Sequence, residues 1–181
     1  MTKYFLLLCW LFNTVSVKAQ SPKADLVKER SWITYRLTHP LHEIEATSKD
    51  ATFQVDLDPK DKEIKSVSSQ VDVTTFDSDN SNRDSHAMEV IDAIDYPEVD
   101  FTSSSIVQNG DSLSVAGKLT FHGITHDIVA HAISQWSQTS LEVNGNFALS
   151  LTAFKIERPS LLMIPVNDTL RFTFTAVFTI Q

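Results

Sequence analysis

The sequence predicts an all-β fold, in which eight antiparallel strands close into a barrel and one short helix covers an end as a lid. Eight segments alternate apolar and polar residues with a period of two, turn residues separate most of them, and one stretch has helical spacing. Such strands bury one face, and closure into a barrel removes the open sheet edges. The segments are 33–37, 53–57, 67–73, 99–101, 113–121, 124–136, 141–151 and 170–180.

The three segments before the helix follow a polar, charged start at Ser21–Arg30. Segment 33–37 is the first, and segment 53–57 ends at the turn-forming sequence DPKD. Segment 67–73 repeats valine on one face. Each of the three is therefore expected to bury one apolar face.

Two dipeptides predict tight turns after the helix. Asn109-Gly110 tolerates the positive φ angles of a type I′ hairpin, and His122-Gly123 makes the second turn. Segment 113–121 between them has one apolar face. Segment 124–136 is apolar on both faces, so we expect it to be covered on both sides.

The last two segments complete the barrel. Segment 141–151 contains Asn144-Gly145, but its alternation continues through this dipeptide, which favours a strand with a bulge or bend over a hairpin. Segment 170–180 has an apolar face opposite Arg and Thr. A barrel of eight strands is wide enough to be filled by side chains or to hold one small ligand.

The expected helix lies within FDSDNSNRDSHAMEVIDAIDYPEVDF, residues 76–101. We expect Ser81 or Asn82 to cap it and Asp84 to lie in its first turn, where the helix dipole favours a carboxylate. Arg83 and His86 would tie the helix to neighbouring loops.

The second half of this helix carries its apolar face, which should cover one end of the barrel. Tyr96-Pro97 ends the helix, because the residue before a proline disfavours helical conformation. The expected apolar residues are Ala87, Met88, Val90, Ile91 and Ile94.

The acids of this stretch also suggest a calcium loop. Asp77, Asp79 and Ser81 fit the first, third and fifth positions of an EF-hand. Asn82 and Met88 stand where that loop needs glycine and a bidentate glutamate. The pattern therefore argues against calcium.

Asp84, Ser85 and His86 contain the residue types of a hydrolase triad. Adjacent residues on a helix point in different directions, whereas a triad needs a chain of hydrogen bonds. We therefore predict no catalytic residue. An enzyme that uses His86 or His122 is kept as an alternative.

The other histidines form no obvious metal motif. A zinc site of three histidines would need convergence from different strands. We therefore predict no metal and expect these side chains to face solvent. They are His39, His42, His122, His126 and His131.

The N-terminal residues have the pattern of a signal peptide. Lys3 precedes the apolar run Tyr4–Phe12, and a cleavage site lies between Ala19 and Gln20. The run is shorter than the roughly 20 apolar residues that span a bilayer. We expect residues 1–19 to be removed, a periplasmic or secreted protein, no transmembrane segment, and a single domain over residues 25–181.

Charge and cysteine content exclude several classes. The formal net charge is −8, which disfavours nucleic acid and anionic membrane surfaces as partners. Cys9 is the only cysteine, and it would leave with the signal peptide. The mature chain would then have neither a disulfide nor a thiolate nucleophile.

Two separated motifs resemble the YceI-like family of polyisoprenoid-binding periplasmic proteins. The first begins at Phe76-Asp77-Ser78 and continues to Asp95-Tyr96-Pro97 and Phe101, and the second is GKLTFHGIT at residues 117–125. The motif residues with an expected structural role are Asn82, Arg83, Asp84, His86, Tyr96, Pro97, His122 and Gly123.

The resemblance implies a lipocalin-like barrel with a helical lid, in an exported protein that holds a long isoprenoid chain in an apolar tunnel. We expect inward-facing strand residues and two lid residues to line this tunnel. They are Tyr35, Phe53, Val71, Val73, Met88, Ile91, Phe101, Leu119, Phe121, Phe147, Leu149, Phe172, Phe174 and Phe178.

The expected function is therefore the binding of an isoprenoid or other lipid, without catalysis and without a further cofactor. One alternative is a ligand-free interaction or stress protein that docks on a partner through its acidic face or through the apolar stretch Ser160–Pro165, expected as a loop at the barrel mouth. The sequence also leaves a homodimer open.

Overall fold

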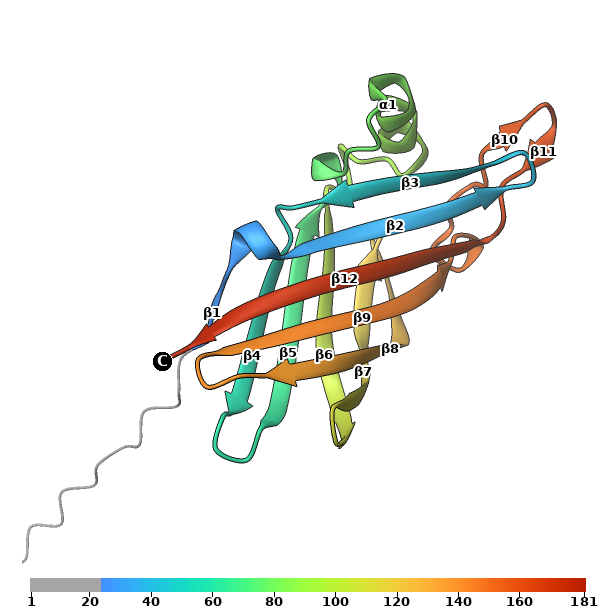
Figure 1. Ribbon diagram of the computed structural model, residues 1–181. Helices are drawn as coiled ribbons and strands as arrows, with labels where there is room; N and C mark the ends of the chain where they lie inside the picture. Colours follow the sequence, from blue (N-terminus) through green and yellow to red (C-terminus); the bar gives the residue numbers. More distant parts are fainter. Residues whose placement is uncertain (1–23) are drawn as a thin grey trace, which may run out of the picture.

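Residues 24–181 are described by the structure, a computed structural model. One large antiparallel sheet curls around an apolar interior, and a short helix lies over one end (Figure 1). The all-β fold class with a helical lid is thereby confirmed. The elements are β1 (Ala24–Leu26), β2 (Trp32–His39), β3 (His42–Ser48), β4 (Thr52–Asp58), β5 (Glu63–Asp72), α1 (Ser81–Val90), β6 (Glu98–Asn109), β7 (Ser112–Phe121), β8 (Ile124–Trp136), β9 (Ser140–Ser150), β10 (Ser160–Leu161), β11 (Ile164–Pro165) and β12 (Thr169–Ile180).

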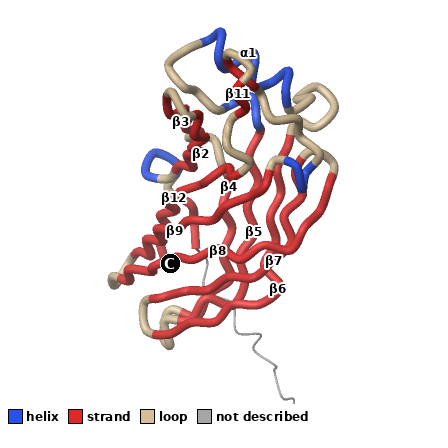
Figure 2. The backbone as a smooth tube through the Cα atoms, turned by 90° about the vertical axis from the view of Figure 1, so that its right-hand side faces the viewer, coloured by secondary structure: helices blue, strands red, loops and turns tan. Residues whose placement is uncertain are grey.

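The strand order is β3-β2-β12-β9-β8-β7-β6-β5-β4, with β1 paired to β12 beside β2. The two ends of this path, β3 and β4, are not joined by a ladder, and β4 lies beside β1 instead. The free edge of β3 is the seam of the barrel, and residues 75–77 lie against it. A single β-bridge joins Thr47 of β3 to Asp77, and the Ser48 hydroxyl lies 2.6 Å from that of Thr75. The curled sheet is seen from the side in Figure 2, with α1 over one end.

The main sheet contains ten strands rather than the eight expected. Strand β3 was missed because its sequence, HEIEATS, has only Ile44 and Ala46 as apolar residues. It forms because β2 turns back at Pro40-Leu41 and pairs with it from His39 to Ile33. Strand β1 is only three residues long and depends on β12.

The two predicted turns both form tight hairpins. His122 and Gly123 have φ angles of 50° and 68°, the two positive values of a type I′ turn. At the other hairpin Asn109 is the last strand residue and pairs with Ser112, so the turn is Gly110-Asp111 with positive φ only at Gly110. This pattern fits a type II′ turn, so the predicted I′ turn at Asn109-Gly110 is wrong by one residue.

The later strands differ from expectation in two details. The outer face of β8 is not covered, since Val129 and Ile133 there are 49% and 54% exposed. Strand β9 runs through Asn144-Gly145 as a strand, as expected, but without a bulge, because Gly145 pairs with Phe174 in a regular ladder. A glycine is needed at position 145 because the ring of Phe174 packs against it, as described below.

The helix begins one residue earlier and ends earlier than predicted. Asn80 is the cap and accepts a hydrogen bond from the amide N–H of Arg83, whereas Ser81 and Asn82 lie inside the helix. Ile91 is the C-terminal cap and Asp92 has a φ of 49°, so the chain leaves the helix well before Pro97. As a result Ile94 is 97% exposed and is not part of the apolar face.

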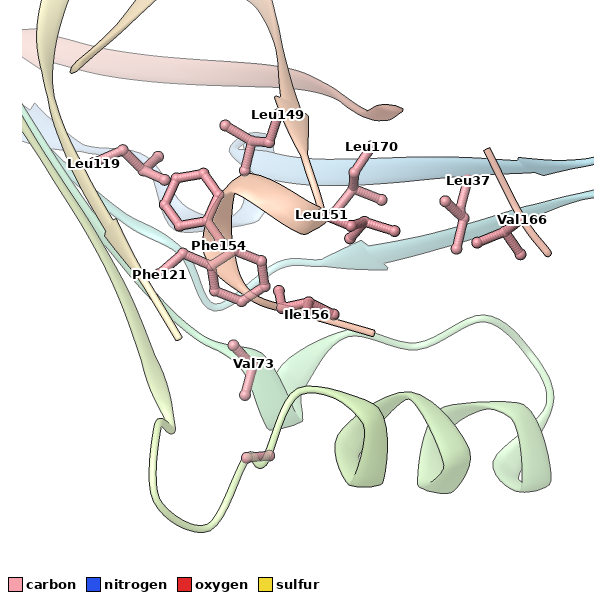
Figure 3. Packing of buried hydrophobic residues seen from close by; sticks show 11 residues of the cluster. Leu37, Val73, Leu119, Phe121, Leu149, Leu151, Phe154, Ile156, Val166 and Leu170 are labelled. Atoms are coloured by element: carbon pink, nitrogen blue, oxygen red, sulfur yellow. The ribbon is translucent and has the colours of Figure 1, made fainter. Parts of the chain in front are cut away.

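A cluster of hydrophobic side chains packs together at the lid end of the barrel (Figure 3). The 3₁₀ turn Thr152–Phe154 follows β9 and brings Phe154 against Phe121, with ring centroids 5.7 Å apart. Ile156 lies beside this pair, on the side toward Val73. Val73 itself lies in a 3₁₀ turn after β5, not in the strand.

The apolar stretch Ser160–Pro165 forms a small hairpin, β10–β11. Its tip residues, Leu162 and Met163, are 76% and 95% exposed. No helix among the described residues is long and apolar enough to span a bilayer. The predicted signal peptide at residues 1–19 lies outside the described residues.

Candidate ligand-binding site

The interior beneath α1 is hollow. A cavity of about 510 Å³, here called the lid cavity, lies between α1, the β10–β11 hairpin and the inner faces of β2, β3 and β12. Apolar side chains form most of its wall. The exposed residues Asn80, Asn82 and His86 and the partly buried Arg83 form a polar rim, and the buried His39 and the exposed His42 also border the cavity.

A second cavity of about 90 Å³, the distal cavity, lies deeper in the barrel, away from the lid. Apolar residues of β2, β4 to β9 and β12 line most of it. None of the described residues lines both cavities. The barrel interior therefore contains two cavities with separate linings.

Glycines on the barrel wall leave room for aromatic rings to lie flat against it. A Cβ added to Gly145 would lie 2.3 Å from Cζ of Phe174, and one added to Gly117 would lie 2.5 Å from Cζ of Phe101. Both rings line the distal cavity. A side chain on either glycine would push the neighbouring ring into the distal cavity.

Twelve of the fourteen residues predicted to line the interior border a cavity, six in each. Val71 and Leu149 border neither and are buried within the hydrophobic core. The lid cavity is bordered by Tyr35, Val73, Met88, Ile91, Phe121 and Phe172. The distal cavity is bordered by Phe53, Phe101, Leu119, Phe147, Phe174 and Phe178.

Tyr35 contributes a phenol to the lid cavity. Burial raises the pKa of this phenol, and the nearby carboxylate of Asp84 raises it further. The group is therefore neutral at physiological pH. It can act as a hydrogen-bond donor there without bringing a charge into an apolar space.

The start of α1 is tied to the loop before it. Arg83 donates from Nε to Oγ of Ser78, at 2.8 Å, and from Nη2 to the carbonyl oxygen of Ser78. The Ser78 hydroxyl donates to the carboxylate of Asp84. Because Asp77 bridges to Thr47, this network connects the lid to the seam of the barrel.

The end of the lid is held by His122. Its Nδ1 lies 2.9 Å from the carbonyl oxygen of Phe154, and its Nε2 lies 3.2 Å from a carboxylate oxygen of Asp92. The ring also packs edge-on against Tyr96, with centroids 4.7 Å apart. Gly123 leaves space for Tyr96, since a Cβ there would lie 2.5 Å from its ring. Pro97 accepts the amide hydrogen bond of Val73 through its carbonyl oxygen.

The expectation that the histidines face solvent is wrong for His39 and His122. His39 is 2% exposed, and its Nε2 lies 3.0 Å from the carbonyl oxygen of Ile164 while Nδ1 accepts from the amide of Leu41. His122 is largely buried in the contacts just described. In residues 24–181, no group of three or more His, Cys, Asp or Glu side chains is placed to hold a metal ion.

Asp84, Ser85 and His86 do not assemble into a triad. The Asp84 carboxylate accepts from Ser78, and the exposed His86 ring has Nδ1 3.7 Å from a carboxylate oxygen of Glu89. His86 therefore does not tie α1 to a neighbouring loop, although Arg83 does.

Several residues of the site were not predicted. Asn80 caps the helix and borders the lid cavity, and it lies one residue before Ser81, the nearer of the two expected caps. Ile44 was missed together with β3, although the alternation of Ile44 and Ala46 was a weak signal for it. Phe76 was visible in the motif, but only the fold brings it to Tyr35, with centroids 5.3 Å apart.

Comparison with known proteins identifies the family. The family model for the YceI-like domain matches residues 25–178. Protein YceI of Salmonella newport (strain SL254) is 28% identical over 131 residues, which are 71% of this chain and 69% of that protein.

Two solved structures show the same fold. BcnA of Burkholderia cenocepacia has a TM-score of 0.77 at 22% identity and covers 84% of this chain and 99% of its own. A polyisoprenoid binding domain from Saccharophagus degradans, implicated in plant cell wall breakdown, has a TM-score of 0.63 at 10% identity and covers 89% and 99%. At these identities the likeness establishes the fold.

Proposed function

Because the chain belongs to the YceI-like family, we propose that it is an exported, non-catalytic protein that binds a long apolar chain, an isoprenoid or another lipid, inside the barrel. The observation that carries this proposal is the lid cavity of about 510 Å³, which has an apolar wall and a polar rim. A space of this volume falls within the range of small-molecule sites, roughly 300–1,000 Å³. A polyisoprenoid binding domain with the same fold supports the ligand class.

The affinity would come from burial of the chain. Each CH₂ removed from water contributes about 0.8 kcal/mol, so burial of about ten methylenes corresponds to micromolar binding if the cavity already exists. An apolar chain needs few hydrogen bonds to the protein, because burial supplies most of its binding free energy. The neutral phenol of Tyr35 and the apolar lid residues Met88 and Ile91 suit such a ligand.

The rim would hold the polar end of the ligand in water. Asn80, Asn82 and His86 are exposed at the rim, and Arg83 lies partly buried beside them. An amphiphile would thus lie with its chain under α1 and its head group beside the start of the helix. The Ser78 contacts of Arg83 fix the guanidinium, so the rim is in place before a ligand enters.

Two variants of α1 test the site directly. Ala87 borders the lid cavity, and Ser85 is exposed on the same helix and does not. Ala87→Phe should fill part of the cavity and weaken binding by tenfold or more, and Ser85→Phe should leave it unchanged. The measurement is native mass spectrometry of protein purified from its own source, followed by rebinding of a fluorescent isoprenoid to stripped protein.

Equal rebinding by the Ala87→Phe and Ser85→Phe proteins would contradict binding in the lid cavity. Purified protein that carries no lipid and rebinds none would contradict the function itself and favour an interaction protein. Export has its own test: N-terminal sequencing of the periplasmic protein should begin at Gln20.

A further inference from the structure

A row of three aromatic rings lies across neighbouring strands between residues of the lid cavity and residues of the distal cavity. Tyr35 of β2, Phe172 of β12 and Phe147 of β9 are direct cross-strand neighbours in register. The rings of Phe147 and Phe172 are stacked, with centroids 4.7 Å apart and planes 7° from parallel. Tyr35 packs edge-on against Phe172 at 6.4 Å.

The two stacked rings belong to different compartments. Phe172 borders the lid cavity and Phe147 borders the distal cavity. The division runs through neighbouring strands as well, since Leu119 borders the distal cavity and Phe121, two residues later on β7, borders the lid cavity. The stacked pair is therefore a wall shared by both cavities.

Small side chains on the far side of this pair leave space for the distal cavity. Small residues Ala130, Ala132 and Ala176 line the distal cavity, and Gly145 lets the ring of Phe174 lie against the sheet. The compartment is apolar, so it suits the end of an apolar chain. The stacked pair Phe147–Phe172 lies where this compartment and the lid cavity come closest in the register of β9 and β12.

We propose that Phe172 and Phe147 determine the length of chain that the protein accepts, by stopping the chain at the floor of the lid cavity. This inference rests on the proposed function. Up to the floor, each CH₂ tightens binding by about fourfold. A longer chain gains nothing further, because its additional carbons stay outside the barrel in water.

The test uses stripped mature protein and a series of linear isoprenoid alcohols of increasing length, with dissociation constants from isothermal titration. In the wild type, affinity should rise with length and then level off. In Phe172→Ala and Phe147→Ala the rise should continue to longer alcohols, with about fourfold tighter binding for each additional CH₂ admitted. Phe172→Leu, which keeps an apolar side chain, serves if an alanine variant does not fold.

Phe178→Ala is the matched control. Phe178 is buried and borders the distal cavity, but it does not belong to the stacked pair. Its removal enlarges the distal cavity and should leave the levelling-off length at the wild-type value. If the Phe172 and Phe147 variants also keep that value, the pair does not set the length, although the protein binds chains. If no alcohol binds to wild type or variants, both the proposed function and this inference are wrong.

Discussion

The ring of Phe174 lies directly over Gly145, so close that a Cβ at position 145 would be 2.3 Å from its Cζ and 2.9 Å from Cβ of Ala132. Phe174 and Gly145 are register partners on β12 and β9. The absence of a side chain at Gly145 leaves space for the ring of Phe174 against the barrel wall. The Phe174 ring also stacks on the ring of Phe53, with centroids 5.9 Å apart.

We expect Gly145→Ala to lower the free energy of unfolding by about 1–3 kcal/mol, because the added methyl overpacks the wall. Urea denaturation measures the change. The double variant Gly145→Ala, Phe174→Leu should recover part of the loss, and Asn146→Ala, on the exposed face of the same strand, should change little. A single variant as stable as the wild type would show that the ring moves away without cost.

Asp168 should make stability depend on pH. A hydrogen bond from the Ser150 hydroxyl, 2.6 Å away, is the main cause that holds the pKa of this carboxyl below its ordinary value, and the amide N–H of Thr152 adds to it. A carboxyl with a lowered folded-state pKa stabilises the protein above its unfolded pKa, and this contribution is lost as the pH falls through the folded pKa.

Asp168→Asn should therefore lower the unfolding temperature at pH 7, and the difference from wild type should shrink as the pH falls below about 4. Thermal unfolding followed by circular dichroism at several pH values measures this. Ser150→Ala should reduce the same pH dependence. A difference that is constant over the whole range would mean that the carboxylate charge is not the cause.

His122 should hold the end of the lid. His122→Ala removes contacts to the carbonyl of Phe154 and the carboxylate of Asp92, and we expect a loss of about 1–3 kcal/mol in unfolding free energy. Amide hydrogen exchange in residues 81–96 should accelerate more than in β7 and β8. His131→Ala, exposed on β8, is the control. Uniform acceleration over the barrel would contradict a specific role at the lid.

Substitutions at the tip of the β10–β11 hairpin should increase the stability of the protein. Leu162 and Met163 have φ angles of 53° and 65°, which cost non-glycine residues roughly 1–2 kcal/mol each. Replacing the pair by Asn-Gly, the preferred type I′ sequence, should raise the unfolding free energy by about 0.5–2 kcal/mol in urea denaturation. An Ala-Ala replacement removes the exposed apolar side chains but keeps the positive φ angles, and it should give no such gain.

Local patterns were enough to predict much of the fold. Period-two alternation identified eight strands, because inward and outward positions alternate along any strand with one buried face. His122-Gly123 predicted its turn, since few sequences adopt two successive positive φ angles. Strand β3 was missed because its few apolar residues gave little periodic signal, and it is stabilised mainly by pairing with β2.

The sequence alone thus determined the all-β class, the lid helix and the aromatic character of the interior. Only the tertiary structure decided that this interior holds two cavities with separate linings. Tyr35, Phe147 and Phe172 come from three strands far apart in the chain, and their alignment depends on the register of β2, β12 and β9. Periodicity fixes which face a residue occupies, whereas the register between distant strands fixes which rings meet, and the wall between the cavities is a consequence of that register.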